Sequence, residues 1–330
     1  MITFSIILDY EDYKHAGVVF EQNKEIHMKT MKAWLQASRL PSQSYIFFPL
    51  LLGAGAWRAT GGTLDWALLA ASQLYGLFLQ LYIVYANDWA DAPIDAANNT
   101  YNIFSGGSRV IPEGKLSRRA LGWGAVVMVA LNLALALALW LGAGRVWQLP
   151  LVVISFALLW MYSFPPVKLS YRGGGEFLQV AGVGLVLPLV GYSLQSGELA
   201  SFPWHWLAFL LPMDLAASLS TTLPDEPSDR AAGKMTFAAR YGSGPVKIAI
   251  VGLYLAGLAI FVLVSGAGWL HGLMISVVPL GFSLALPGLV KDSPAGSARC
   301  SRFVTLAVAT KVVWTASAAF YFLLALPRGI

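Results

Sequence analysis

The sequence contains few charged residues. Asp, Glu, Lys and Arg make up 12% of its 330 residues, whereas hydrophobic residues make up 57%. Because roughly 25% of the residues in a soluble domain are charged, this composition excludes an ordinary soluble globular domain. Cysteine is also scarce, and the single Cys300 excludes an internal disulfide and any metal site built from several cysteines. We therefore predict an integral membrane protein.

Long apolar runs recur along the chain. A helix needs about 20 apolar residues to cross a bilayer, and the runs predict about nine transmembrane helices, with eight or ten as alternatives. The expected fold is an all-α, polytopic membrane protein. The runs lie near residues 41–57, 65–86, 119–142, 146–163, 176–194, 204–223, 246–266, 268–288 and 303–327.

Lys and Arg gather in the N-terminal segment and in alternate loops. The other loops and the C-terminus hold only Arg58, Arg145 and Arg328. Since cytoplasmic loops accumulate positive charge, we predict that the N-terminus and the basic loops are cytoplasmic, at the plasma membrane if the protein is prokaryotic. The net charge of +5 follows from this sorting and indicates no nucleic-acid partner.

The N-terminal residues do not follow the apolar pattern of the rest. Acidic residues alternate there with short apolar pieces, without the apolar run of a signal peptide. We predict a cytoplasmic extension over residues 1–38 and one transmembrane domain over residues 39–330. Translation that starts at Met28 or Met31 is an alternative.

Two aspartate-rich stretches lie at the ends of predicted helices. The first contains one asparagine and three aspartates, and a continuing helix would place all four on one face. Pro93 would end or kink that helix. The second contains two aspartates spaced four residues apart. The members are Asn87, Asp88, Asp91 and Asp95 in the first stretch and Asp225 and Asp229 in the second.

If the two stretches meet, their carboxylates require cations. Two like charges about 5 Å apart repel by roughly 3 kcal/mol at an effective dielectric near 20, and several such pairs would exceed the marginal stability of a domain. Mg²⁺ prefers oxygen ligands and is held by a few carboxylates together with substrate phosphates. The predicted Mg²⁺ ligands are Asp88, Asp91, Asp95, Asp225 and Asp229.

Basic residues in the neighbouring loops are candidate phosphate contacts. Because they lie on the same predicted side as the aspartates, they could bind the anionic part of a substrate. Membrane topology is the competing explanation, since cytoplasmic loops are basic without any substrate. The candidates are Arg109, Lys168, Arg172 and Lys234.

These residues carry a resemblance to a known family. The first stretch resembles the N-D-x-x-D-x-x-x-D motif, and the second the D-x-x-x-D motif, of the UbiA superfamily of intramembrane prenyltransferases. Between them lies a loop, residues 162–168, that also resembles the family. The resemblance extends from Arg39 to Lys234 and implies about nine helices around a central cavity.

The resemblance also implies an activity and roles for individual residues. It implies Mg²⁺-dependent transfer of an isoprenoid chain from a prenyl diphosphate to a lipophilic acceptor within the membrane, with membrane lipid as a further partner. The catalytic residues would be Asp91, Asp95, Asp225, Asp229 and Lys168, and the diphosphate contacts would be Asn87, Arg109, Tyr162, Lys168, Arg172 and Lys234.

Within the superfamily, residues 106–117 and 168–173 are most similar to the branch that prenylates 1,4-dihydroxy-2-naphthoate in menaquinone synthesis. That branch has Asn-Asn-x-Arg before its second motif, where this chain has residues 221–224, Thr-Thr-Leu-Pro. Proline cannot replace the fork of donors that Arg presents to phosphate or carboxylate. An aromatic quinone precursor is the expected acceptor, and residues 221–224 indicate where this chain differs from the branch.

Several alternatives remain open. Within the same fold, the acceptor could be a lipid, a carotenoid or a tetrapyrrole, or the enzyme could cyclise its substrate. A catalytically silent scaffold is opposed by the retention of all the motif aspartates and Lys168. A cation-coupled transporter is a more distant alternative, because a transport site is expected near the midplane between internal repeats.

Other polar and aromatic residues fall inside predicted helices. Asp214 and Lys311 would each cost roughly 2.5–3.5 kcal/mol at the membrane centre, so we predict that they face the interior and pair. Aromatic rings could stabilise an allylic cation. The candidate rings, by position, are Tyr82, Tyr85, Trp89, Tyr162 and Tyr192.

Overall fold

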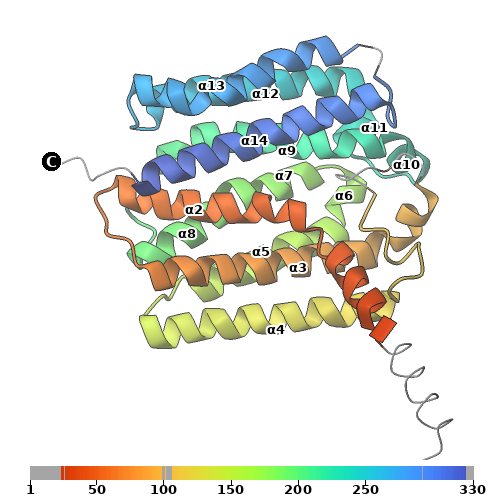
Figure 1. Ribbon diagram of the computed structural model, residues 1–330, viewed down its shortest axis with the longest axis horizontal. Coiled ribbons are helices and arrows are strands. Elements are labelled where there is room, and N and C mark those ends of the chain that lie inside the picture. Colours follow the sequence, from red (N-terminus) through yellow and green to blue (C-terminus); the bar gives the residue numbers. More distant parts are fainter. Residues whose placement is uncertain (1–23, 26, 99–100, 102–105, 292, 325–330) are drawn as a thin grey trace, which may run out of the picture.

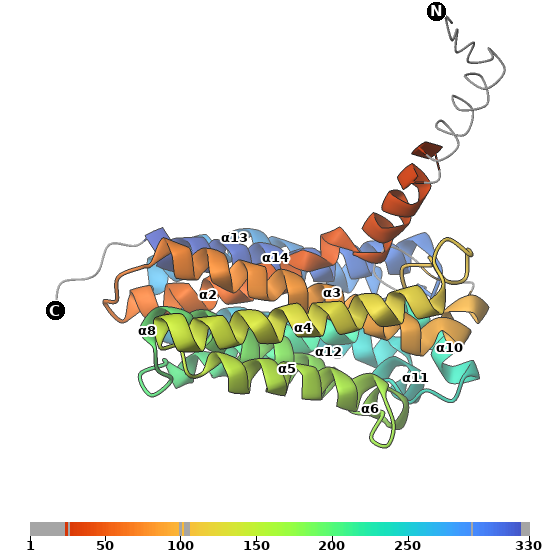
Figure 2. The same ribbon diagram turned by 90° about the horizontal axis from the view of Figure 1, so that it is seen from below.

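The computed structural model describes residues 24–25, 27–98, 101, 106–291 and 293–324, and all regular structure in these segments is helical. The long helices run side by side along one axis, and the short helices α6, α10 and α11 gather at one end (Figures 1 and 2). The α-helices are α2 (Ser44–Ala59), α3 (Trp66–Ala97), α4 (Arg118–Ala143), α5 (Gln148–Ser163), α6 (Leu169–Arg172), α7 (Gly175–Val180), α8 (Leu187–Ser196), α9 (Leu207–Thr222), α10 (Glu226–Ala231), α11 (Phe237–Tyr241), α12 (Ser243–Val264), α13 (Trp269–Ala285) and α14 (Ala298–Leu324).

Seven helical segments in the described part are long and apolar enough to cross a membrane. One of them joins α7 to α8 through a π-helical segment, η2 (Ala181–Val186), and another joins α9 to α10. The all-α membrane fold is confirmed. α2 and α5 have only 16 residues each, which is shorter than the usual span of about 20, so the number nine stays a prediction.

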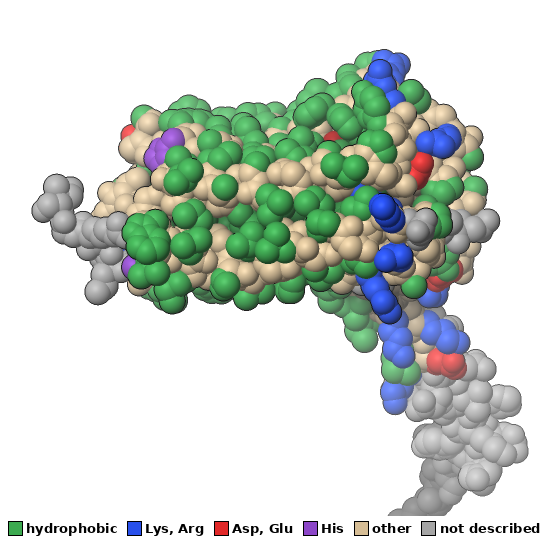
Figure 3. Space-filling view, turned by 90° about the horizontal axis from the view of Figure 1, so that it is seen from above, with side chains coloured by type: hydrophobic (Ala, Val, Ile, Leu, Met, Phe, Trp, Pro, Cys, Tyr) green, Lys and Arg blue, Asp and Glu red, His purple; other side chains and the backbone are tan. Residues whose placement is uncertain are grey.

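Charged and apolar side chains are separated along the bundle. Hydrophobic side chains are spread along the length of the face seen in Figure 3, whereas Lys and Arg gather at the end from which the N-terminal segment projects. This end, called the charged end below, also carries α6, α10 and α11. The separation agrees with the charge sorting seen in the sequence.

Helix α3 continues past the proline that was expected to disturb it. Pro93 cannot donate a hydrogen bond to the carbonyl of Trp89, but Nε of Arg118 donates to that carbonyl at 2.8 Å. The helix therefore continues to Ala97 instead of ending at Pro93. As a result, every aspartate of the first stretch lies on a regular helix.

Helices α2 and α8 pack backbone against backbone. A Cβ atom on Gly53 would overlap with the carbonyl of Pro188, and one on Gly191 would overlap with the carbonyl of Leu50. Small residues at such a contact let membrane helices approach closely. This contact holds one wall of the central cavity in place.

A cavity of about 760 Å³ lies between α2, α3, α5, α7, α9 and α14. Its lining extends from Arg39 and Arg109 at the charged end to Asp214 and Val308 within the bundle. The predicted central cavity is therefore present, with the aspartates of α3 beside its polar end.

Candidate active site

The first aspartate stretch is buried at the charged end of α3. Asp88, Asp91 and Asp95 are 3%, 7% and 9% exposed, and the helical spacing places their side chains on one face, as predicted. Three carboxylates this close together and this poorly hydrated require positive or hydrogen-bonding partners. The structure supplies these partners from distant parts of the chain.

The two aspartate stretches meet at one lysine. Nζ of Lys234 lies 3.3 Å from Oδ2 of Asp91 and 3.7 Å from Oδ1 of Asp229. Nδ2 of Asn98, just after α3, donates to Oδ1 of Asp225 at 2.8 Å. The stretches are therefore brought together as the sequence suggested, and a cation already lies between them.

Lys234 is charged in this position. Burial alone would lower the pKa of its ammonium group, but the carboxylates of Asp91 and Asp229 raise that pKa above its ordinary value. A protonated lysine between two carboxylates offsets the repulsion that the sequence indicated. Thr236 adds a hydrogen bond of 3.0 Å from its Oγ1 to Oδ2 of Asp229.

Asp88 is held by a residue that the sequence analysis did not place in the site. The guanidinium of Arg39 forms an ion pair with its carboxylate. The backbone N–H of Ser108 donates to the same carboxylate at 3.3 Å, and the Ser108 hydroxyl donates to it as well. Arg39 precedes the first long apolar run and begins the segment that resembles the family, but neither signal identified its partner.

Tyr171 was also missed, although it lies within residues 168–173, which are similar to the naphthoate-prenylating branch. Its hydroxyl donates to Oδ1 of Asp91 at 2.8 Å, and burial together with the Asp91 carboxylate raises its pKa above the ordinary value. Nζ of Lys168 lies 3.4 Å from the centre of the Tyr171 ring. Lys168 thus contacts an aromatic face beside the carboxylates, while Arg172 is exposed.

Arg109 approaches the site from the loop before α4. Its guanidinium donates to the backbone carbonyl of Asp95 and lies 4.3 Å from the centre of the Tyr101 ring. Asn87 completes the polar edge of the cavity and donates from Nδ2 to Oδ2 of Asp91 at 3.3 Å. Both predicted phosphate contacts are therefore beside the carboxylates.

Among the described residues, the non-glycine residues with positive φ are Arg39 (43°), Arg109 (68°) and Lys168 (47°). This left-handed conformation costs about 1–2 kcal/mol for a residue with a side chain. All three residues are basic, and all three lie at the carboxylate cluster or the polar end of the cavity. Backbone strain that persists at such a cluster is typical of a functional site.

The donor set fits a hard divalent cation. Carboxylate oxygens from α3 and α10 face each other across the single ammonium group of Lys234, and oxygen ligands are those that Mg²⁺ prefers. Within the described part of the chain, no three acidic or histidine side chains are grouped tightly enough to hold a metal ion as they stand. The lysine occupies the place between the carboxylates.

The deeper cavity has one polar wall. Gln179 accepts a hydrogen bond from the Ser218 hydroxyl and donates from Nε2 to the Tyr162 hydroxyl at 3.1 Å. The predicted pair of Asp214 and Lys311 is confirmed, with Nζ and Oδ2 2.8 Å apart and both side chains almost fully buried. These groups give the interior hydrogen-bonding capacity without excess charge.

Among the candidate rings, Tyr162 lines the cavity. Tyr45 and Tyr101 line it too, although the sequence analysis did not name them, because their positions depend on how the helices pack. The other predicted rings pack elsewhere: Tyr82 against Phe156, Tyr85 against Trp34, Trp89 against Phe164 and Tyr192 against Trp57.

Comparison with known proteins connects this geometry to a family. The model of the UbiA prenyltransferase family matches residues 46–309, which include both aspartate stretches and the loop between them. The chain belongs to the UbiA prenyltransferase family. This confirms the resemblance drawn from the motifs and the predicted enzyme class, and it confirms an integral membrane protein.

Two relatives with named activities match this UbiA chain over different shares of its length. The 1,4-dihydroxy-2-naphthoate octaprenyltransferase of Mycobacterium tuberculosis (strain ATCC 25618 / H37Rv) is 23% identical over 82% of this chain and 89% of its own. The digeranylgeranylglyceryl phosphate synthase of Korarchaeum cryptofilum (strain OPF8) is 30% identical over 54% of this chain and 57% of its own.

The fold also matches a solved UbiA structure. A UbiA homolog from Archaeoglobus fulgidus, bound to DMAPP and Mg²⁺, superposes with a TM-score of 0.63 at 14% identity, over 88% of this chain and 99% of its own. At this identity the likeness shows the fold. The UbiA site of the present chain is therefore argued from its own residues.

The glycine in the loop before α4 gives a first test of that site. Gly107 has φ +72° and touches the carboxylate cluster so closely that a Cβ atom would overlap with Oδ2 of Asp95. Gly114, in the same loop, has φ +67°, but a Cβ atom there meets nothing within 4 Å. Both alanine variants should lose about 1–2 kcal/mol of stability from the left-handed backbone.

Only Gly107→Ala should also displace the Asp95 carboxylate and lower prenyl transfer, by roughly tenfold or more, as expected for small displacements of positioned groups. Steady-state rates of the two purified variants, beside their thermal unfolding curves, measure this difference. Equal loss of activity in both variants would show that loop strain, rather than contact with Asp95, matters.

Proposed function

We propose that the protein transfers an isoprenoid chain from a prenyl diphosphate to a lipophilic acceptor in the membrane. One observation supports this most directly: carboxylates from both aspartate motifs converge on Lys234 beside a membrane-embedded cavity lined by Arg39 and Arg109. An anionic head group and an apolar tail would find complementary surroundings there.

Mg²⁺ is the proposed cofactor, held by Asp91, Asp95, Asp225 and Asp229, with Asp88 beside them. When bound, it would neutralise charge on the departing diphosphate. The family membership and the Mg²⁺ bound to the Archaeoglobus fulgidus homolog support this assignment.

The basic residues would hold and orient the diphosphate. Arg109, Lys168 and Lys234 are proposed to bind its oxygens, with Asn87, Tyr162 and Arg172 as further predicted contacts. The allylic C–O bond then breaks, its electron pair leaves with the diphosphate, and the electron-rich acceptor bonds to the carbon and loses a proton. The apolar residues that line the cavity would shield the allylic cation from water during this step.

An aromatic quinone precursor is the proposed acceptor. The relative from Mycobacterium tuberculosis supports a hydroxylated naphthoate-like class, and the hydrogen-bonding wall of Gln179, Ser218 and Tyr162 offers partners for phenolic hydroxyls. Thr221, which lines the cavity, stands where the branch begins its Asn-Asn-x-Arg sequence. A lipid acceptor is the alternative, supported by the archaeal relative.

We also propose that the charged end faces the cytoplasm, with residues 1–38 as an extension on that side and residues 39–330 as the membrane domain. The concentration of Lys and Arg at this end supports the orientation. Labelling of cysteines introduced into the loop at residues 112–115, in intact cells and in inverted vesicles, would reveal the side on which the loop lies.

The activity can be tested in membranes that contain the protein. Radiolabelled prenyl diphosphates of several lengths, Mg²⁺ and a panel of aromatic, lipid and tetrapyrrole acceptors should give at least one prenylated product, identified by mass spectrometry. Chelation with EDTA should remove product formation, and added Mg²⁺ should restore it. Neither product nor diphosphate release from any donor would contradict the proposal.

A further inference from the structure

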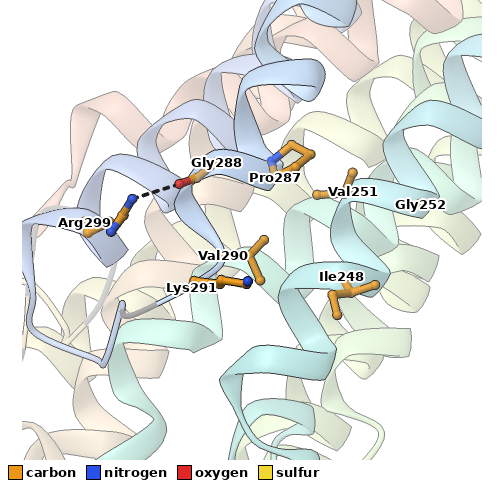
Figure 4. A pocket seen from close by; sticks show the side chains of 8 residues that line it. All are labelled: Ile248, Val251, Gly252, Pro287, Gly288, Val290, Lys291 and Arg299. Carbon is orange, nitrogen blue, oxygen red and sulfur yellow. Dashed lines mark hydrogen bonds between the residues drawn. The ribbon is translucent and has the colours of Figure 1, made fainter.

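A second hollow of about 680 Å³ lies on the outside of the bundle at its charged end. It is formed by the start of α12, the 3₁₀ turn η5 (Leu286–Leu289) with the residues that follow it, and the start of α14 (Figure 4). None of its lining residues belongs to the carboxylate site or the central cavity. The residues are Ile248, Val251, Gly252, Pro287, Gly288, Val290, Lys291 and Arg299.

The floor of this groove is apolar and open to the surroundings of the helices. Ile248 is 65% exposed, and Val251, Pro287 and Val290 continue the same surface. Gly252 leaves a gap in the face of α12, since a Cβ atom there would meet nothing within 4 Å. In a membrane protein, a groove of this shape can hold a hydrocarbon chain.

Two cations lie at one side of the groove. Figure 4 shows Arg299 and Lys291 opposite the apolar side chains of Ile248, Val251 and Pro287. Arg299 donates from one terminal nitrogen to the carbonyl of Gly288 at 3.0 Å, which fixes the guanidinium at the rim. Both side chains are exposed, so they can bind an anion. Asp292, the next residue, lies outside the described part.

We propose that this groove binds an anionic diacyl phospholipid from the leaflet at the charged end. An acyl chain lies along Ile248, Val251 and Gly252, and the phosphate lies between Lys291 and Arg299. Basic pockets between transmembrane helices bind anionic head groups in this way. Charge complementarity selects an anionic lipid over a zwitterionic one, and the apolar floor of the groove selects a lipid over free phosphate.

The proposal is tested with purified protein in neutral detergent, by the shift in its thermal unfolding temperature on titration with dioctanoyl phosphatidylglycerol, dioctanoyl phosphatidylcholine or inorganic phosphate. Phosphatidylglycerol should bind at least tenfold more tightly than phosphatidylcholine, and phosphate alone should have no effect. Each cation at an anionic lipid contributes a factor of about five in affinity. Lys291→Gln should therefore weaken phosphatidylglycerol binding about fivefold, and adding Arg299→Gln should weaken it about 25-fold.

Matched variants separate the groove from general effects. Arg119→Gln removes an exposed cation from α4 at the same end and should leave binding unchanged. Gly252→Leu fills the groove, whereas Gly281→Leu places the same side chain at an exposed glycine of α13 that also has open space around it. Both changes favour the helix, but only Gly252→Leu should weaken lipid binding.

Three results would overturn the proposal. They are equal affinity for the two lipids, stabilisation by inorganic phosphate as strong as that by phosphatidylglycerol, and unchanged affinity in both Lys291→Gln and Gly252→Leu. Lys291→Gln removes no hydrogen bond within the described structure, so this variant should fold. It therefore tests the groove even if the variant that also carries Arg299→Gln unfolds. Prenyl transfer in neutral detergent should be unaffected by these variants, because the groove shares no residue with the active site.

Discussion

Replacing Asp91 by Asn should lower Mg²⁺-dependent prenyl transfer by roughly 10²–10³-fold. One ionised oxygen ligand to the metal contributes about 3–4 kcal/mol to stabilising the charge of the leaving group. Asn keeps the size of the side chain and can still accept the hydrogen bond from Tyr171, so the fold should persist. Asp229→Asn should behave alike, because Asp229 lies on the other side of Lys234.

The same helix provides the control. Asp65 caps the opposite end of α3, where its side chain accepts hydrogen bonds from the backbone of Ala67 and Leu68. Asn is an equally good N-cap residue, so Asp65→Asn makes the same chemical change far from the site and should leave the rate unchanged. Initial rates over a range of Mg²⁺ concentrations measure both. Full activity in Asp91→Asn would remove Asp91 from the catalytic residues.

The second large effect concerns stability. Lys311→Met should lower the free energy of unfolding by about 3–5 kcal/mol, because it leaves the buried carboxylate of Asp214 without its partner. Gly184 packs directly against that carboxylate, and a Cβ atom added at Gly184 would lie only 2.9 Å from Oδ2 of Asp214. The residues around the carboxylate therefore have little room to rearrange. Denaturant titration in mixed micelles measures the loss.

A second substitution separates charge from packing. Asp214→Asn combined with Lys311→Met removes both charges and should recover most of the lost stability, because a buried pair can be replaced by neutral groups at little cost. Arg302→Met changes an exposed cation on the same helix and should stay within about 0.5 kcal/mol of the parent. If the double variant were as unstable as Lys311→Met, the loss of stability would come from altered packing and not from the unpaired charge.

Patterns within one segment were predicted well. The helical spacing of the first aspartate stretch and the interior position of Asp214 and Lys311 follow from local geometry and from the cost of charge in a membrane. Pro93 was expected to end or kink the helix, whereas α3 continues past it to Ala97. Arg118, which satisfies the carbonyl freed by Pro93, lies 25 residues further along the chain, and nothing in the local pattern reveals that contact.

The site residues that the sequence did not reveal are those that contact distant segments of the chain. Arg39 on Asp88 and Tyr171 on Asp91 join positions 49 and 80 residues apart. A basic residue near a membrane helix is expected from topology alone, so its partner cannot be chosen from its sequence. Lys234 was named as a phosphate contact, but its place between Asp91 and Asp229 depends on how α3 and α10 meet.

The sequence by itself determined that this is an all-helical membrane protein with two aspartate motifs of the UbiA family, because hydropathy and helical spacing are properties of neighbouring residues. Only the tertiary structure decided which cation lies between the motifs, which wall of the cavity is polar, and where the outer groove with Lys291 and Arg299 forms. Those features arise where helices far apart in the chain pack together, and packing depends on the shapes of all their side chains at once.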